Sequence, residues 1–190
     1  KDCADAPGWS RPLAVWLLKR ERRALERLAG QEGFPQILAQ VDARALLIGN
    51  LPGHAMHGEV FAETPRAWAE ALRQRVAVMH SCSVYHLDLR QPQNLLADAH
   101  HGLSVVDFGA AFAPGPIGRL LYGRLLAWVD RRAALKYLSR FAPEEMSEAE
   151  ARSYLRALIW RRLWIFSPHH NRGAEQAVRR RLRDLSAGGG

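Results

Sequence analysis

Residues 86–109 read HLDLRQPQNLLADAHHGLSVVDFG, and this stretch decides how the rest of the chain is interpreted. Two short apolar runs, LLA and LSVV, flank a polar turn that contains Gly102. This pattern predicts a β-hairpin. Because a hairpin brings its two ends together, Asn94 and Asp107 are expected to meet in space. An amide oxygen and a carboxylate that converge beside a second carboxylate, Asp88, suit Mg²⁺, which prefers oxygen ligands.

The order of these residues resembles the catalytic loop of protein kinases followed by their Asp-Phe-Gly metal motif. The resemblance implies that Asp88 orients or deprotonates an acceptor hydroxyl, and that Asn94 and Asp107 bind Mg²⁺. Arg90 stands where the kinase pattern usually has a lysine that faces the γ-phosphate, and its permanent charge could serve there. The alternative interpretation is an ordinary hairpin with two surface aspartates.

The loop departs from the kinase pattern at two positions. The kinase asparagine comes five residues after the aspartate, where this chain has Gln93, and Asn94 comes one residue later. We interpret Pro92 as the mark of a one-residue expansion and favour Asn94, because it adjoins the apolar run as the kinase asparagine does. The second departure is Leu87 in place of arginine. In regulated protein kinases that arginine pairs with a phosphorylated activation loop, so we expect this control to be missing.

A helix is predicted over residues 13–28, with Ser10 as its cap, and Glu21 falls on its apolar stripe. A carboxylate on a buried face is costly unless it is paired. The kinase resemblance implies that the partner is a strand lysine, whose ion pair with the helix glutamate holds the α- and β-phosphates. The only lysine before the helix is Lys1, so Lys1 and Glu21 are the candidates. Alternatively, Glu21 pairs with Arg22 or faces solvent, and Lys1 is a mere terminal residue.

Two further strands are predicted over residues 36–42 and 45–50, and Leu51-Pro52-Gly53 then breaks the chain like a hinge between lobes. By resemblance, Ile48 lies at the back of an adenine pocket, and the backbone from Gly49 to Leu51 binds adenine. No Gly-rich loop precedes Lys1. We therefore expect the chain to be a piece of a longer protein, which lacks here two strands and the phosphate-covering loop.

After Gly109 the resemblance to regulated protein kinases fades. Residues 142–144, Ala-Pro-Glu, match the end of a kinase activation segment. However, residues 118–141 predict a helix, and Pro143 with the acidic residues after it equally suits the start of another helix. This pattern looks more like the RIO-type kinases and the lipopolysaccharide-core sugar kinases. The expected fold is therefore α+β: a kinase-like two-lobed domain over 1–190, with a truncated N-lobe (1–51), a mainly helical C-lobe (52–185) and a flexible tail (186–190).

The charge is uneven along the chain. Residues 1–114 hold 12 Lys and Arg against 12 Asp and Glu, whereas residues 115–190 hold 15 against 7 and supply the whole net charge of +8. The basic C-terminal region, in which arginines alternate with Trp160, Trp164 and Phe166, predicts attraction to acidic membrane lipids, lipopolysaccharide phosphates or, less favoured, nucleic acid. The alternative is a solvated helical face.

Taken together, the residues and the resemblance predict an ATP- and Mg²⁺-dependent phosphotransferase that acts on a hydroxyl of a protein Ser/Thr or a lipopolysaccharide-type sugar. Two distant cysteines, no long apolar run and no visible signal peptide predict a cytoplasmic protein, peripheral at most to the inner membrane face. Two alternatives stay open. One is a pseudokinase or scaffold without transfer activity, and the other is a module that binds RNA or acidic membranes.

Overall fold

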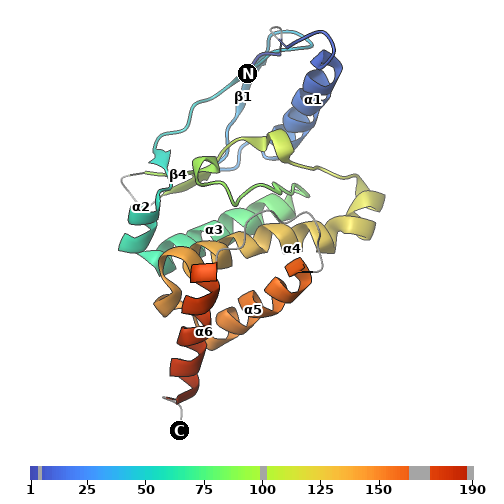
Figure 1. Ribbon diagram of the computed structural model, residues 1–190. Coiled ribbons are helices and arrows are strands. Elements are labelled where there is room, and N and C mark those ends of the chain that lie inside the picture. The colour runs from blue at the N-terminus through green and yellow to red at the C-terminus, as the bar shows by residue number, and fades with distance from the viewer. Residues whose placement is uncertain (4–5, 99–101, 163–171, 188–190) are drawn as a thin grey trace. The chain divides into compact units, whose positions relative to one another are not determined.

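The computed structural model describes residues 1–3, 6–98, 102–162 and 172–187 (Figure 1). Its helices are α1 (Arg11–Arg27), α2 (Gly58–Glu63), α3 (Pro65–Ser81), α4 (Pro116–Phe141), α5 (Glu148–Arg162) and α6 (Arg172–Ala187). Its strands are β1 (Ile37–Gln40), β2 (Leu46–Ile48), β3 (His54–Ala55), β4 (Leu95–Ala97) and β5 (Leu103–Val105). Three short 3-10 helices are η1 (Pro92–Asn94), η2 (Phe108–Ala110) and η3 (Pro143–Glu145). The protein is therefore mostly helical α+β with small antiparallel sheets.

The chain forms two compact units that do not follow the sequence order. The first unit comprises Lys1–Met56 and Ala71–Arg131, and the second comprises His57–Glu70 and Arg132–Gly190. Every predicted site residue lies in the first unit. The predicted division into two lobes and a tail stays a prediction, and α6 continues through Ala187.

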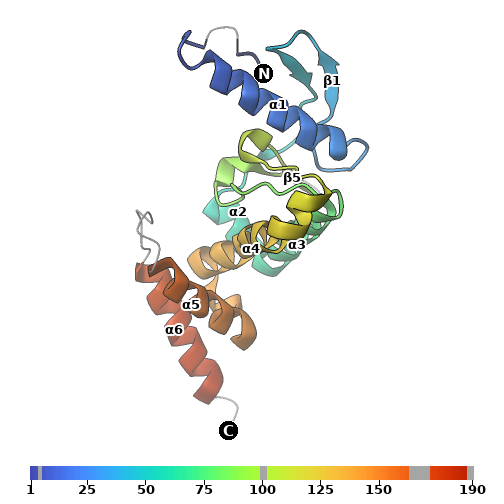
Figure 2. The same ribbon diagram turned by 90° about the vertical axis from the view of Figure 1, so that its right-hand side faces the viewer.

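In the first unit, the two strands predicted over residues 36–42 and 45–50 are present as β1 and β2, and they pair antiparallel with Ile37 opposite Ile48. The first three residues run beside β2, because the N–H of Leu46 donates to the carbonyl of Lys1 at 2.9 Å and the N–H of Cys3 to that of Arg44 at 3.0 Å. These backbone bonds fix the position of Lys1 at the end of the chain. Helix α1 lies beside this hairpin (Figure 2).

The apolar stripe of α1 is buried, as its 3.6-residue period predicts. Leu18, Ala24, Leu25 and Leu28 are at most 6% exposed. Full burial of each leucine stabilises the fold by about 1.5–3 kcal/mol. Helix α1 begins earlier than predicted, and Ser10 makes no side-chain cap, because its hydroxyl donates instead to the carbonyl of Pro7 at 3.1 Å.

The predicted hairpin after the catalytic loop is confirmed, since β4 and β5 pair antiparallel with Leu95 opposite Val105. The sequence did not predict β3, which adds to the free edge of β4 through His54 and Ala97. Gly53, just before β3, has a φ of +116°, and a Cβ there would lie 2.7 Å from the carbonyl oxygen of Ala97. Only glycine allows this close backbone approach.

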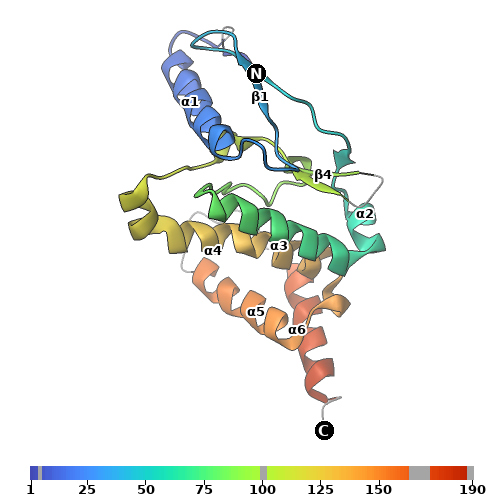
Figure 3. The ribbon, with the colours of Figure 1, turned by 180° about the vertical axis from the view of Figure 1, so that it is seen from behind.

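Helices α3 and α4 lie side by side within the first unit, where the His80 and Asp130 side chains meet (Figure 3). Helix α4 was predicted over residues 118–141, and it begins two residues earlier. Gly123 and Ala127 are buried on one side of α4, and a Cβ on Gly123 would lie 2.9 Å from the Tyr85 hydroxyl. Small residues thus let α4 approach the segment that leads into residues 86–94.

The second unit has its own aromatic core. The Phe61 ring of α2 stacks on Tyr137 with 5.5 Å between ring centroids and lies 6.1 Å from Phe141. Arg66 pairs with Glu150 of α5 at 2.8 Å. The residues Ala142-Pro143-Glu144 lead directly from α4 into η3. Among the residues with described positions, no helix has the length and apolar character needed to cross a membrane.

Candidate active site

The loop at residues 86–94 is anchored by a buried carboxylate on α4. Asp130, 1% exposed, accepts the backbone N–H of His86 at 2.9 Å and that of Leu87 at 2.8 Å. Its Oδ2 also lies 3.1 Å from Nε2 of His80. Leu87 has a φ of +67°, a strained conformation for a residue with a side chain, and the bond to Asp130 holds it there.

The His86 ring is fully buried and braces the backbone of the loop. Its Nε2 lies 3.0 Å from the carbonyl oxygen of Val106 and therefore donates, while its Nδ1 accepts the N–H of Asp88 at 3.3 Å. This pattern requires the neutral ring. Burial lowers the pKa of His86 below 6.5, against the opposing effects of the Val106 carbonyl and the nearby carboxylates, and so favours the neutral form.

Asn94, not Gln93, turns toward Asp88. The Asn94 amide nitrogen donates to the carbonyl oxygen of Asp88 at 2.9 Å and to its carboxylate at 3.3 Å, and Asn94 is 3% exposed. Gln93 is exposed. The 3-10 helix η1, which starts at Pro92, takes up the extra residue of the loop. Arg90 is exposed on the same loop.

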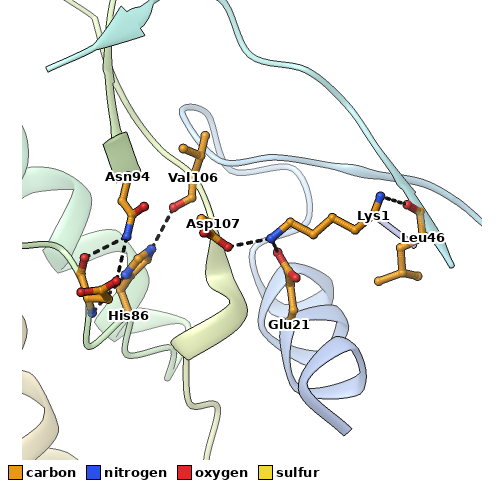
Figure 4. Close-up of polar contacts among 8 residues, drawn as sticks. Lys1, Glu21, Leu46, His86, Asn94, Val106 and Asp107 are labelled. Carbon is orange, nitrogen blue, oxygen red and sulfur yellow. Dashed lines mark hydrogen bonds and ion pairs between the residues drawn. The ribbon is translucent and has the colours of Figure 1, made fainter. Parts of the chain in front are cut away.

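The second part of the site is a cluster of three charged side chains, Lys1, Glu21 and Asp107 (Figure 4). Glu21 belongs to α1, and Asp107 is the residue before η2. Nζ of Lys1 lies 2.7 Å from a carboxylate oxygen of Glu21 and 2.6 Å from one of Asp107. The ion pair predicted between Lys1 and Glu21 is therefore present. The Glu21 side chain is 6% exposed, whereas those of Lys1 and Asp107 are 43% and 58% exposed.

The contacts within this cluster perturb two of its pKa values. Burial opposes the charge of Lys1, but the hydrogen bonds to Asp107 and Glu21 outweigh it and raise the pKa of Lys1 above 10.5. The hydrogen bond from Lys1 is the main reason that the pKa of Asp107 falls below 3.8, although partial burial opposes it. Both groups are therefore ionised at neutral pH.

Arg20 of α1 fastens this helix to the segment after Asp107. One guanidinium nitrogen of Arg20 donates to the carbonyl oxygens of Ala110 at 3.2 Å and Ala111 at 2.9 Å. The Arg20 guanidinium carbon also lies 4.6 Å from the Trp16 ring centroid and 5.8 Å from that of Phe112. Thus the helix that carries Glu21 and the segment that follows Asp107 are joined directly.

Rings connect this segment to the loop. The Phe108 ring packs edge-on against His86, with 4.8 Å between centroids, and against Phe34 at 6.2 Å. Tyr85 and Phe112 exchange two backbone hydrogen bonds of 3.0 and 2.8 Å. Residues that precede and follow the hairpin are therefore packed together.

The residues predicted to contact a nucleotide base lie after β2. Ile48, Gly49 and Leu51 are all partly exposed. The N–H of Gly49 donates to the carbonyl oxygen of Gln36 at 2.8 Å, so this residue would offer a base its carbonyl oxygen rather than its N–H. Their role in base binding stays a prediction.

The predicted metal ligands are Asn94 and Asp107. Because the Asn94 amide nitrogen faces Asp88, its remaining polar atom is an oxygen, and with the Asp107 carboxylate it supplies the hard donors that fit Mg²⁺. The described side chains contain no group of three or more His, Cys, Asp or Glu placed to hold a metal ion. A shared cation at Asn94 and Asp107 stays a prediction.

Sequence reasoning missed Asp130 and Arg20. A signal for Asp130 was present, because it is the only acidic residue between 116 and 141 and stands among apolar and basic neighbours. A lone carboxylate in such a helix indicates a buried partner, by the reasoning that identified Glu21. Arg20 gave no comparable signal, since its partners are main-chain carbonyls that any residue supplies.

Known proteins resemble parts of this chain. It is 39% identical over 61 residues to CBL-interacting protein kinase 19 and 45% identical over 58 residues to CBL-interacting protein kinase 9, both from Oryza sativa subsp. japonica. The matched segments are 32% and 30% of this chain but only 12% of each rice protein. These matches relate the chain to the protein-kinase-like superfamily. No protein-family model matches it.

Among solved structures, monomeric WbdD resembles 67% of this chain and 39% of its own, at 18% sequence identity and a TM-score of 0.42. A likeness this loose adds nothing about mechanism or substrate. The relation to the kinase-like superfamily therefore rests on the sequence matches.

Proposed function

We propose that the protein is an ATP- and Mg²⁺-dependent phosphotransferase that transfers the γ-phosphate to a hydroxyl of a protein Ser/Thr or a lipopolysaccharide-type sugar. The observation that supports this most is the pairing of Asp88 with Asn94 in a loop held by buried Asp130. A loop fixed in this way keeps the Asp88 carboxylate in one orientation, which the alignment of an attacking hydroxyl requires.

Each site residue has a distinct role in this proposal. Asp88 orients the acceptor hydroxyl and accepts its proton. Asn94 and Asp107 would hold Mg²⁺, which neutralises phosphate charge when bound. Lys1, oriented by Glu21, contacts the α- and β-phosphates, and Arg90 faces the γ-phosphate. Ile48, Gly49 and Leu51 contact the adenine.

Calorimetric titration with ATP, in the presence and absence of Mg²⁺, tests the proposal. The unmutated protein should bind ATP more tightly with Mg²⁺, and Asp107→Ala should abolish that gain because the metal loses its anionic ligand. Glu63→Ala, which removes an exposed carboxylate of the second unit, is the matched control and should leave the gain unchanged. If the unmutated protein binds no nucleotide at millimolar ATP and Mg²⁺, the proposal is wrong.

A pseudokinase or scaffold is the second candidate, and one observation favours it. Asp107 already forms an ion pair of 2.6 Å with Lys1, and a lysine in that place competes with a cation for the carboxylate. In a pseudokinase this pair would persist whatever the nucleotide concentration. In the phosphotransferase, Lys1 moves its contact from Asp107 to the phosphates as the nucleotide arrives.

The proposal implies a cytoplasmic location, where ATP is available, and an anionic surface or acceptor for the basic C-terminal region. Arg172, Arg180 and Arg183 of α6 belong to that region. Trp164 and Phe166 lie outside the described residues, and so does 163–171 as a whole. An RNA-binding module would instead show affinity for RNA that falls with salt and needs no ATP.

A further inference from the structure

The first three turns of α4 expose an unusual amount of apolar surface. The side chains concerned are between 45% and 82% exposed, and they are Ile117, Leu120, Leu121, Tyr122, Leu125 and Trp128. Isolated exposed apolar residues are normal, but a run of six large ones on one helix marks an interaction surface. The first turns of α4 are drawn in yellow in Figure 3.

Most of these residues lie away from the side by which α4 packs in the first unit. The inward side is formed by Gly123, Ala127 and Asp130, which are spaced at four and three residues and are all buried. Ile117, Leu121 and Trp128 are spaced at four and seven residues and therefore share another face, turned from the first by more than a third of the helix circumference.

The charges on the same turns are all positive apart from one buried group. Arg119, Arg124 and Arg131 are exposed, and the only acidic residue of the helix, Asp130, is buried and bonded to the backbone of the catalytic loop. Residues 117–129 contain no acidic residue at all. An apolar face bordered by cations, with a tyrosine and a tryptophan, has the composition of helices that lie in the headgroup region of a bilayer.

We propose that the apolar face at residues 117–128 of α4 docks onto a membrane surface that carries acidic lipids. The helix would lie in the plane of the membrane, with Ile117, Leu121 and Leu125 against the acyl chains. Arg124 would contact a lipid phosphate and contribute attraction that salt screens, whereas Arg119 donates to the Ser83 hydroxyl at 3.0 Å. A second copy of the chain is a poorer occupant, because two such faces would bring like charges together.

This surface does not depend on the proposed phosphotransfer. It uses none of the residues assigned to nucleotide or metal, although its helix carries Asp130, which holds the catalytic loop. Docking would therefore hold α4, the helix that anchors the catalytic loop, at the membrane.

Co-sedimentation with vesicles tests the proposal. The unmutated protein should bind vesicles of phosphatidylcholine mixed with phosphatidylglycerol more tightly than vesicles of phosphatidylcholine alone. The double variant Leu121→Glu/Leu125→Glu should weaken this binding by at least about tenfold, because two inserting side chains become charged. Arg124→Gln should weaken it by about fivefold and lower its salt dependence.

A matched control has the same chemistry elsewhere on the first unit. Leu13 and Leu47 are 56% and 53% exposed, so Leu13→Glu/Leu47→Glu adds the same two charges without touching α4. The control should bind acidic vesicles like the unmutated protein, apart from a small general effect of charge. Circular dichroism and thermal unfolding show whether each variant is folded.

Three results would overturn the proposal. The first is no binding of the unmutated protein to acidic vesicles, and the second is an equal loss in the control and in Leu121→Glu/Leu125→Glu. The third is a concentration-dependent dimer in analytical ultracentrifugation that this α4 variant abolishes, since the face would then join two copies of the chain. Failure of ATP binding would not bear on this proposal, and vesicle binding would not bear on the phosphotransferase.

Discussion

The loop that carries Asp88 and the cluster that carries Asp107 are built in opposite ways. The loop is held by backbone hydrogen bonds to a carboxylate that is 1% exposed, whereas the cluster is a set of ion pairs in which Lys1 and Asp107 are about half exposed. Charges near solvent contribute little to stability, but a buried carboxylate with several donors contributes much. The loop is therefore held in one geometry and should be sensitive to mutation of its anchor. The side chains of the cluster can exchange their ionic partners.

The largest expected effect is that of Asp130→Ala. It leaves the N–H groups of His86 and Leu87 without their acceptor, and should lower the free energy of unfolding by about 3–5 kcal/mol. Urea unfolding followed by circular dichroism measures this. The exposed Glu144→Ala should change the same quantity by less than about 0.5 kcal/mol. Equal effects of the two variants would remove the contrast between loop and surface.

An intermediate effect is expected at the connection between the two regions. Arg20→Gln removes the donor to the carbonyl oxygens of Ala110 and Ala111, and it removes the contacts of the guanidinium with the Trp16 and Phe112 rings. It should destabilise the fold by about 1–2 kcal/mol. Hydrogen exchange should become faster in residues 107–112 and change less in 86–90. If exchange in the two segments rises equally, the loop depends on Arg20 as well as on Asp130.

A smaller effect is expected in the cluster. Asp107→Asn removes a half-exposed ion pair with Lys1, and should change the free energy of unfolding by less than about 1 kcal/mol. The same substitution at the anchor, Asp130→Asn, should cost more, because the amide replaces one accepting oxygen by an NH₂ group that faces a backbone N–H. Both variants are compared in one urea series. A larger loss for Asp107→Asn would contradict the assignment of stability to the loop.

As the pH falls, the stability contributed by His86 in the loop should be lost before the stability contributed by Asp107 in the cluster. The pKa of His86 is lowered in the folded protein. Near pH 6.5 the unfolded chain therefore binds a proton at this residue more readily than the folded protein does. The free energy of unfolding consequently falls as the pH drops below 6.5. The pKa of Asp107 is also lowered, so its contribution is present above 3.8 and is lost only as pH falls further. His86→Asn should therefore flatten the stability profile between about pH 6.5 and 5. An unchanged slope would mean that other groups dominate there.

The sequence predicted the elements whose pattern is local. The 3.6-residue stripe of α1, the hairpin around Gly102 and the placement of Glu21 follow from periodicity and from the cost of a buried charge, and all are present. The pairing of Lys1 with Glu21 came from the kinase resemblance, because nothing local relates residues twenty positions apart.

What the sequence did not predict depends on tertiary packing. Strand β3 has only two residues and exists because β4 offers a free edge and Gly53 allows the approach. Asp130 lies more than forty residues from the backbone groups that it binds, so no spacing rule connects them. The exposed face of α4 was also hidden, because its apolar residues read as core in the sequence alone.

The central claim is that the fixed loop aligns an acceptor through Asp88, and phosphate transfer tests it most directly. Transfer from ATP to water or to an added acceptor is measured for the unmutated protein and Asp88→Ala, with ATP affinity determined by calorimetry on the same preparations. The account predicts nearly equal affinities and a transfer rate lower by about 10²–10⁴-fold in Asp88→Ala. Tight ATP binding with equal transfer rates in both proteins would contradict it.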